Sequence, residues 1–188
     1  MVLQDIGEEV QLEVNLIDEI QRVMLERMQE NKIPIRLAAM SALVRLQDPH
    51  NFECPVIQAY LRALLSGSAQ IRKEATERIA PNVMTLSKIR DRVRDTDVGV
   101  RAMAFHRCAD IGPLNFRIVD KHLILLCGFK ETNEKVKKTF SEYLLPKWLT
   151  GYKGDFLKFL EALKLIADEE DISKMTYLSK ELIRVFYK

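Results

Sequence analysis

The chain has 188 residues, of which 47% are hydrophobic and 30% are charged, and its formal net charge is +2. This composition provides enough apolar side chains for a packed core and is too hydrophobic for a disordered chain. The net charge is unevenly distributed, because residues 1–31 sum to −6 and the remaining residues sum to +8. The basic segment after residue 31 is compatible with binding to an anionic partner, but the charge alone does not identify that partner.

Cysteine usage indicates the compartment. Cys54, Cys108 and Cys127 are odd in number and widely spaced, so we expect buried free thiols and no disulfide framework. The start of the chain has no basic and then apolar signal segment, and the apolar run 122–129 is far too short to span a bilayer. We therefore expect a cytosolic or nuclear protein that does not bind membranes.

The first predicted hairpin covers residues 10–47. Apolar residues recur three or four positions apart over residues 10–31, which is typical of one face of a helix. After a short turn, Pro34 can occupy the first turn of a second helix, where its missing N–H costs nothing. Asp48-Pro49 then stops this helix near residue 47.

Four further hairpins follow in the same way. Gly112-Pro113 closes the third hairpin, and the helix that begins at Glu134 is expected to end near Leu145, before Pro146. The predicted hairpins span residues 10–47, 55–80, 83–111, 116–149 and 154–187. Because no linker or alternating strand pattern interrupts them, we expect one continuous array over residues 1–188 with negligible sheet.

A two-residue pattern, Ile or Val followed by Arg or Lys, recurs in the second helix of the first four hairpins. The pairs are Ile35-Arg36, Ile71-Arg72, Val100-Arg101 and Val136-Lys137, at steps of 36, 29 and 36 residues. Three residues after each basic member comes Ala39, Ala75, Ala104 or Phe140. A period of this length fits a two-helix unit of the HEAT or armadillo type. The sequence therefore predicts an all-α fold, an α-solenoid of about five HEAT-type hairpins.

The recurring basic residue has two possible roles. An arginine in the first turn of an inner helix can bind a carbonyl or carboxylate of the neighbouring turn, and Asp95 or Asp97 is a ready partner for Arg101. We therefore interpret Arg36, Arg72 and Arg101 mainly as scaffold residues. Ligand contact is the alternative.

The lysines beside these positions are freer to bind a ligand. Lys73 follows Arg72 and Lys138 follows Lys137, so stacked repeats would align four cations along one edge. Long cationic side chains reach the phosphates of a duplex before its bases, so binding there would depend on salt and not on sequence. A solvated charged face is the other interpretation. Arg72, Lys73, Lys137 and Lys138 are our candidate DNA-phosphate contacts.

Catalytic patterns are absent from the sequence. The segment Gly151–Gly154 lacks the length and the Lys-Ser/Thr ending of a nucleotide-binding loop. His50, His106 and His122 are scattered, and His106 with Cys108 lacks the two further ligands that a zinc site needs. No serine or cysteine nucleophile has a recognisable base. We expect no enzyme activity, no cofactor, no metal and no small-molecule substrate.

Several short strings of residues are more specific than the repeat period alone. The most specific is Arg45–Pro49 followed by Glu53–Val56, and others are Ile71–Lys73 and Leu144–Leu149. In the same order, they resemble strings of the G-type HEAT-repeat subunit of the condensin complex, and the resemblance covers nearly the whole chain. Members of that family are far longer, so the sequence resembles an N-terminal portion or a truncated relative. Lys137 stands where arginine is the commoner choice.

The resemblance implies a non-catalytic condensin subunit that binds the kleisin subunit and double-stranded DNA, without sequence specificity, in mitotic chromosome condensation. It also implies a location in the nucleus, on chromosomes and in the cytoplasm. Two other classes remain open. A generic HEAT-repeat adaptor would bind a protein peptide with weak salt dependence. A truncated condensin-derived protein would have a new role, such as competition for kleisin.

Overall fold

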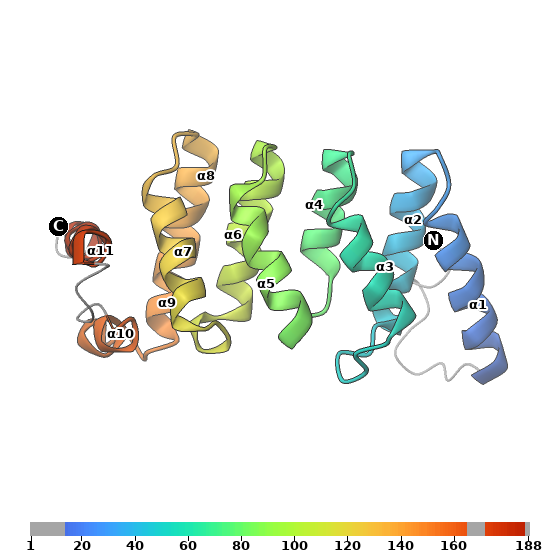
Figure 1. Ribbon diagram of the computed structural model, residues 1–188, viewed down its shortest axis with the longest axis horizontal. Coiled ribbons are helices and arrows are strands. Elements are labelled where there is room, and N and C mark those ends of the chain that lie inside the picture. Colours follow the sequence, from blue (N-terminus) through green and yellow to red (C-terminus); the bar gives the residue numbers. More distant parts are fainter. Residues whose placement is uncertain (1–13, 165–171, 187–188) are drawn as a thin grey trace. The chain divides into compact units, whose positions relative to one another are not determined.

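The computed structural model describes residues 14–164 and 172–186, where every regular element is helical (Figure 1). The helices are α1 (Val14–Arg27), α2 (Ile33–Leu43), α3 (Pro55–Ala63), α4 (Ala69–Arg78), α5 (Val83–Asp91), α6 (Val98–Ile111), α7 (Ile118–Phe129), α8 (Glu134–Lys138), α9 (Leu145–Thr150), α10 (Phe156–Ala162) and α11 (Ile172–Phe186). Short helical turns are η1 (Val44–Leu46), η2 (Arg92–Arg94) and η3 (Pro113–Asn115), and η4 (Thr139–Leu144) is a π-helix.

These elements confirm the predicted all-α fold for the described residues. The predicted helix boundaries at residues 10–13, 165–171 and 187 lie outside those residues. The chain divides into two compact units, residues 1–88 and 89–188, and the border falls within α5. The single continuous array over residues 1–188 therefore stays a prediction.

The first unit shows how the hairpins stack. Helix α1 packs against α2, and α3 packs against α4 (Figure 1). The two hairpins join through contacts of α1 with α3 and of α2 with α4. One layer of outer helices and one layer of inner helices thus bury their apolar faces against each other, as in helical repeat proteins.

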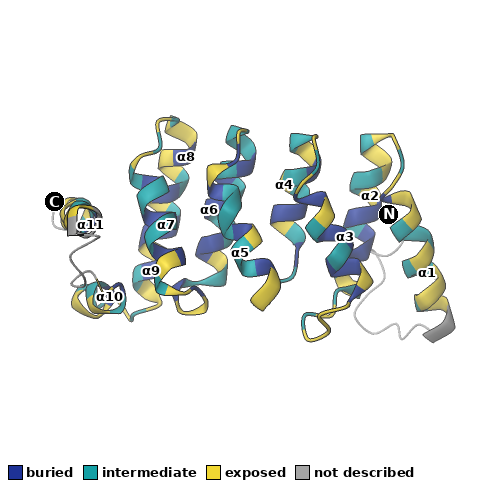
Figure 2. Cartoon of the chain, viewed as in Figure 1, coloured by how far each residue is buried: buried dark blue, intermediate teal, exposed yellow. Residues whose placement is uncertain are grey.

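The recurring apolar-basic pair has the same place in each inner helix. Its apolar member is the third residue of α2, α4, α6 and α8. Three helices bury this residue and every fourth residue after it, as the spacing of a helix requires. The buried triplets are Ile71-Ala75-Ile79, Val100-Ala104-Cys108 and Val136-Phe140-Leu144. Ile35 differs, because it is 37% exposed although Ala39 and Leu43 below it are buried. Figure 2 shows these buried stretches on the helices.

Side chains outside the helices define where α6 and α8 begin. The carboxylate of Asp97 accepts a hydrogen bond from the N–H of Val100 at 3.0 Å. The amide oxygen of Asn133 accepts from the N–H groups of Lys135 and Val136 at 3.1 and 3.4 Å. Each cap satisfies N–H groups that the first turn leaves free, so it sets the register that buries the apolar triplet.

The second helix of the fourth hairpin does not end near Leu145, contrary to the prediction. Elements α8, η4 and α9 follow one another without a gap from Glu134 to Thr150, and Pro146 lies in the first turn of α9. A proline inside an α-helix lacks its N–H and clashes with the carbonyl four residues before it. The carbonyl four residues before Pro146 belongs to Glu142, which lies in the π-helical η4, where the regular α-helical hydrogen-bond pattern is replaced.

Aromatic side chains join four elements of the second unit. The ring of Phe140 in η4 meets Phe105 of α6 and Phe129 of α7 edge-on, with centroids 5.5 and 5.0 Å apart. Trp148 of α9 is fully buried, and its Nε1 donates to the carbonyl of Cys108 in α6 at 2.9 Å. These contacts join η4 and α9, which follow α8 in the chain, to α6 and α7.

Candidate nucleic-acid interface

Two recurring arginines brace the turn in front of their own helix. Arg72 donates from Nη1 to the carbonyls of Ser66 at 2.9 Å and Gly67 at 3.1 Å. Arg101 makes the same pair of hydrogen bonds, at 2.9 and 3.2 Å, to the carbonyls six and five residues before it. The scaffold contacts predicted for these two arginines are therefore present.

The carboxylate partner of Arg101 is not the predicted one. Its Nε and Nη2 donate to the carboxylate of Glu131 at 2.8 and 3.2 Å, which is a bidentate pair. Asp95 instead pairs with Arg92 at 3.2 Å, and Asp97 caps α6. Because Glu131 lies 30 residues after Arg101, spacing near the arginine could not reveal it.

Glu131 also organises the turn between α7 and α8. Its carboxylate accepts from the N–H groups of Thr132 and Asn133 at 3.0 and 2.9 Å. Burial disfavours the charged carboxylate, but the hydrogen bonds from Arg101 and from the two N–H groups outweigh this effect. Together they hold the pKa of Glu131 below its ordinary value.

Arg36 differs from the other two arginines. Its Nε is buried and has no hydrogen-bond partner. Its helix also differs at the preceding position, because Ile35 is 37% exposed where Ile71 and Val100 are fully buried. The shared turn-bracing contact therefore describes Arg72 and Arg101, and the scaffold role of Arg36 stays a prediction.

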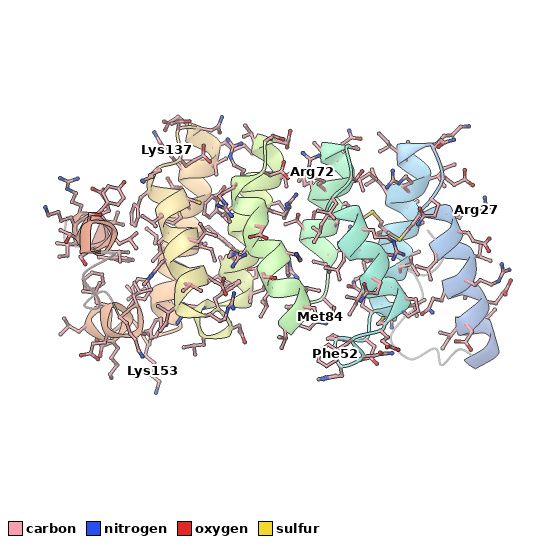
Figure 3. The ribbon with its side chains drawn as sticks, viewed as in Figure 1. Arg27, Phe52, Arg72, Met84, Lys137 and Lys153 are labelled. Carbon is pink, nitrogen blue, oxygen red and sulfur yellow. The ribbon has the colours of Figure 1, made fainter. Side chains whose placement is uncertain are left out.

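The candidate lysines are exposed. Lys73 is exposed beside Arg72 at the start of α4. Lys137 pairs with Glu134 at 2.8 Å and Lys138 with Glu142 at 3.8 Å, and their side chains are 46% and 72% exposed. Ion pairs between exposed side chains contribute little and break at little cost, so both lysines can turn to a phosphate. Figure 3 marks Arg72 and Lys137 on their helices.

The structure brings the four candidates together as two pairs. Arg72 and Lys73 are neighbours in α4 of the first unit, and Lys137 and Lys138 are neighbours in α8 of the second unit. Alignment of both pairs along one edge stays a prediction.

Two further cations lie beside the second pair and were not among the candidates. Lys130 follows the last residue of α7 and Lys135 lies in α8, and both are exposed. Because only four residues, 130–133, separate α7 from α8, these lysines lie at the same end of the hairpin as Lys137 and Lys138. The signal in the sequence was the turn itself, which places cations on both sides of it together. We call Lys130, Lys135, Lys137 and Lys138 the lysine turn.

Within residues 14–164 and 172–186, no group of three or more His, Cys, Asp or Glu side chains could hold a metal ion. The helices in this part of the chain include none that is long and apolar enough to cross a membrane.

Comparison with known proteins shows what this chain is similar to. No protein-family model matches the chain. Condensin complex subunit 3 of Homo sapiens is 33% identical over 165 residues, which are 86% of this chain and 16% of that protein. The protein of the same name from Xenopus laevis is 30% identical over 164 residues, again 86% of this chain and 16% of the relative. This chain is related to condensin complex subunit 3.

A solved structure supports the relationship to the condensin subunit. The chain resembles a chain of the S. pombe condensin Cnd3-Cnd2 subcomplex with a TM-score of 0.80 and 25% identity, over 93% of this chain and 23% of that chain. The predicted resemblance to a condensin HEAT-repeat subunit and the predicted HEAT-type helical fold are thereby confirmed. The chain spans 16% of the length of the human and Xenopus subunits that it matches.

Proposed function

We propose that this chain acts as a non-catalytic HEAT-repeat component of a condensin complex on nuclear chromosomes. In this role it binds a kleisin chain and the backbone of double-stranded DNA during mitotic chromosome condensation. The observation that carries the proposal is the likeness to condensin complex subunit 3 over 86% of the chain. The matching solved structure is a Cnd3-Cnd2 subcomplex, which supports a partner chain for this one as well.

In the proposed DNA binding, the arginines and the lysines have different roles. Arg72 and Arg101 use their guanidinium groups on nearby carbonyls, and Arg101 also uses its group on Glu131. Lys73 and the lysine turn are exposed, although Nζ of Lys130 also lies 5.8 Å from the centroid of the Tyr177 ring. Lysines on flexible stems attract phosphates as point charges and do not read bases, so the binding has no sequence specificity.

Replacement of three exposed lysines by glutamate tests the DNA part. The variant is Lys73→Glu/Lys137→Glu/Lys138→Glu, which leaves Arg72 and its hydrogen bonds to the turn intact. Binding to a random-sequence duplex is measured by fluorescence anisotropy at several salt concentrations. We expect a large loss of affinity and a shallower salt dependence, by about 0.9 in the logarithmic slope for each phosphate that the variant no longer neutralises.

A matched variant controls for net charge. Arg22→Glu/Arg27→Glu/Lys158→Glu changes the charge by the same amount at three exposed side chains outside the candidate set. It should bind the duplex nearly as well as the wild-type chain. Equal losses in both variants would show a general charge effect and would refute the site. Circular dichroism confirms that both variants stay folded.

A further inference from the structure

Three exposed apolar side chains lie in two joined segments of the first unit. Phe52 is 56% exposed, Val83 82% and Met84 39%. Phe52 belongs to the loop between η1 and α3, and the other two residues open α5. The amide of Asn82 donates to the carbonyl of Pro49 at 3.3 Å, which joins the loop to the start of α5. We call Phe52, Val83 and Met84 the Phe52 patch.

The patch lies at one end of its unit. Figure 3 shows Phe52 and Met84 at the same end, and Arg72 at the opposite end of the first unit. A ligand held by the Phe52 patch would therefore leave Arg72 and Lys73 free. Within the first unit, the patch is therefore a surface separate from Arg72 and Lys73.

The loop that presents Phe52 is held in place by long-range hydrogen bonds. The amide of Gln47 donates to the carbonyl of Arg78 at 2.8 Å and accepts from the N–H of Ala80 at 2.7 Å. The carbonyl of Phe52 itself accepts from Nε2 of Gln58 at 2.9 Å. An aromatic side chain on an ordered backbone loses little conformational entropy on binding, which favours its use as an anchor.

Local turns add to this order. The carboxylate of Asp48 accepts from the N–H of His50 at 3.0 Å, and the side-chain oxygen of Asn51 accepts from the N–H of Glu53 at 2.9 Å. These turns tie the backbone on both sides of Phe52 although its side chain is not needed for the core. The string that resembled the condensin subunit most strongly, residues 45–49 with 53–56, flanks this loop.

The surroundings of the patch indicate the kind of ligand. Asp48 and Glu53 are exposed in the loop, and the segments 47–54 and 80–84 contain no lysine or arginine. Lys88 is the first cation along α5, one turn beyond Met84. An apolar centre beside two carboxylates repels phosphates and attracts a cationic polypeptide.

We propose that the Phe52 patch is a docking site for a short segment of another polypeptide that carries an apolar side chain flanked by Lys or Arg. The apolar side chain packs against Phe52 and Val83, and Met84 adapts its flexible side chain to the remaining space. The cations of the segment pair with Asp48 and Glu53. This inference does not depend on the proposed DNA contacts, because it uses other residues and the opposite charge.

Selection of a random displayed library of peptides of about ten residues on the 188-residue chain tests the proposal. We expect the enriched peptides to carry an apolar residue flanked by Lys or Arg. An enriched peptide, labelled and measured by anisotropy, should bind Phe52→Ser at least about tenfold more weakly than the wild-type chain. Asp48→Asn/Glu53→Gln should also weaken binding and should remove most of its salt dependence. The Asn side chain keeps the hydrogen-bond acceptor of the turn, so this double variant changes charge alone.

Leu65→Ser is the matched control. Leu65 is 75% exposed at the end of α3 and belongs to the same unit, but it lies outside the patch. Binding to this variant should equal binding to the wild-type chain. Enriched peptides without cations, unchanged binding to Phe52→Ser, or an equal loss with Leu65→Ser would each overturn the proposal. So would a loss of duplex DNA binding in Phe52→Ser, since that would assign the patch to nucleic acid. Urea unfolding of each variant confirms that the fold is retained.

Discussion

Gly128 is a position where packing leaves no room for a side chain. It lies in α7, and a Cβ atom built on it would come 2.2 Å from the ring of Phe140. That ring is also held edge-on by Phe105 and Phe129, so it cannot move aside freely. The glycine therefore allows α7 to approach η4 closely, and a larger residue would force the aromatic cluster apart.

Gly128→Ala should destabilise the chain because the added methyl group overlaps the Phe140 ring. We expect the free energy of unfolding in urea to fall by about 1–3 kcal/mol, the usual cost of overpacking. Gly67→Ala is the control, since no atom lies within 4 Å of the position of its Cβ. It should leave stability unchanged or raise it slightly through the unfolded chain. A stable Gly128→Ala variant would show that the ring relaxes without cost.

In the inner helices α4 and α6, an arginine side chain holds the turn that precedes the helix. In each, the fourth residue is an arginine that donates to the carbonyls six and five residues before it. A single side chain thus satisfies carbonyls that the turn leaves free. In α6 the same arginine extends to Glu131 of the next turn, so it links two successive hairpins of the second unit.

Arg101→Met should weaken this link in a pH-dependent way. The variant leaves a largely buried carboxylate without its cation, so we expect a loss on the order of 2 kcal/mol at pH 7. The folded-state pKa of Glu131 lies below its ordinary value, so its contribution is fully present above the unfolded pKa of about 4.3. It is lost as the pH falls through the folded-state pKa. The difference in the free energy of unfolding between wild type and variant, measured in urea, should therefore become smaller below about pH 4.

Lys138→Met provides the comparison for an exposed pair. Its partner Glu142 is 3.8 Å away and both side chains are largely exposed, so removal of the lysine should not change stability measurably. If the loss of stability in Arg101→Met stays constant with pH, lost packing of the arginine stem explains it, and the ion pair does not.

The molecule as a whole consists of two compact units whose border lies inside α5. Repeat proteins bury their apolar faces against neighbouring repeats, so binding surfaces extend over several hairpins. The cations proposed for DNA belong to both units, and the Phe52 patch belongs to the first. The two proposals therefore use different side chains, and a polypeptide at the Phe52 patch would not occupy the cations proposed for DNA.

Co-purification tests the kleisin part of the proposed function with the whole chain. We expect a tagged kleisin subunit of condensin to retain this chain through size-exclusion chromatography, because the matching solved structure is a two-subunit complex. The triple lysine variant should be retained equally, since its charges belong to the DNA contacts. Salt-dependent DNA binding without kleisin retention would disprove the kleisin part alone and favour a condensin-derived protein with another role.

The helical hairpins could be predicted because their signals are local. The spacing of Ile71, Ala75 and Ile79, repeated in α6 and α8, reports one buried helix face, and Gly112-Pro113 marks where α6 ends. The adjacent lysines Lys137 and Lys138 were likewise visible as a charged run. Periodicity within a helix and chain reversal at a turn depend on residues only a few positions apart, so they can be read along the chain.

The remaining features depend on groups that are distant in sequence. Arg101 meets Glu131 across 30 residues, and Asn82 reaches Pro49 across 33. No spacing rule names such partners, because they meet only after the hairpins have packed. The same holds for Pro146, whose helix continues from the π-helical η4, an element that packs on α6. Local spacing thus settles which segments are helical, whereas the packing of one hairpin on the next selects the carboxylate that holds each arginine and the apolar side chains that remain exposed.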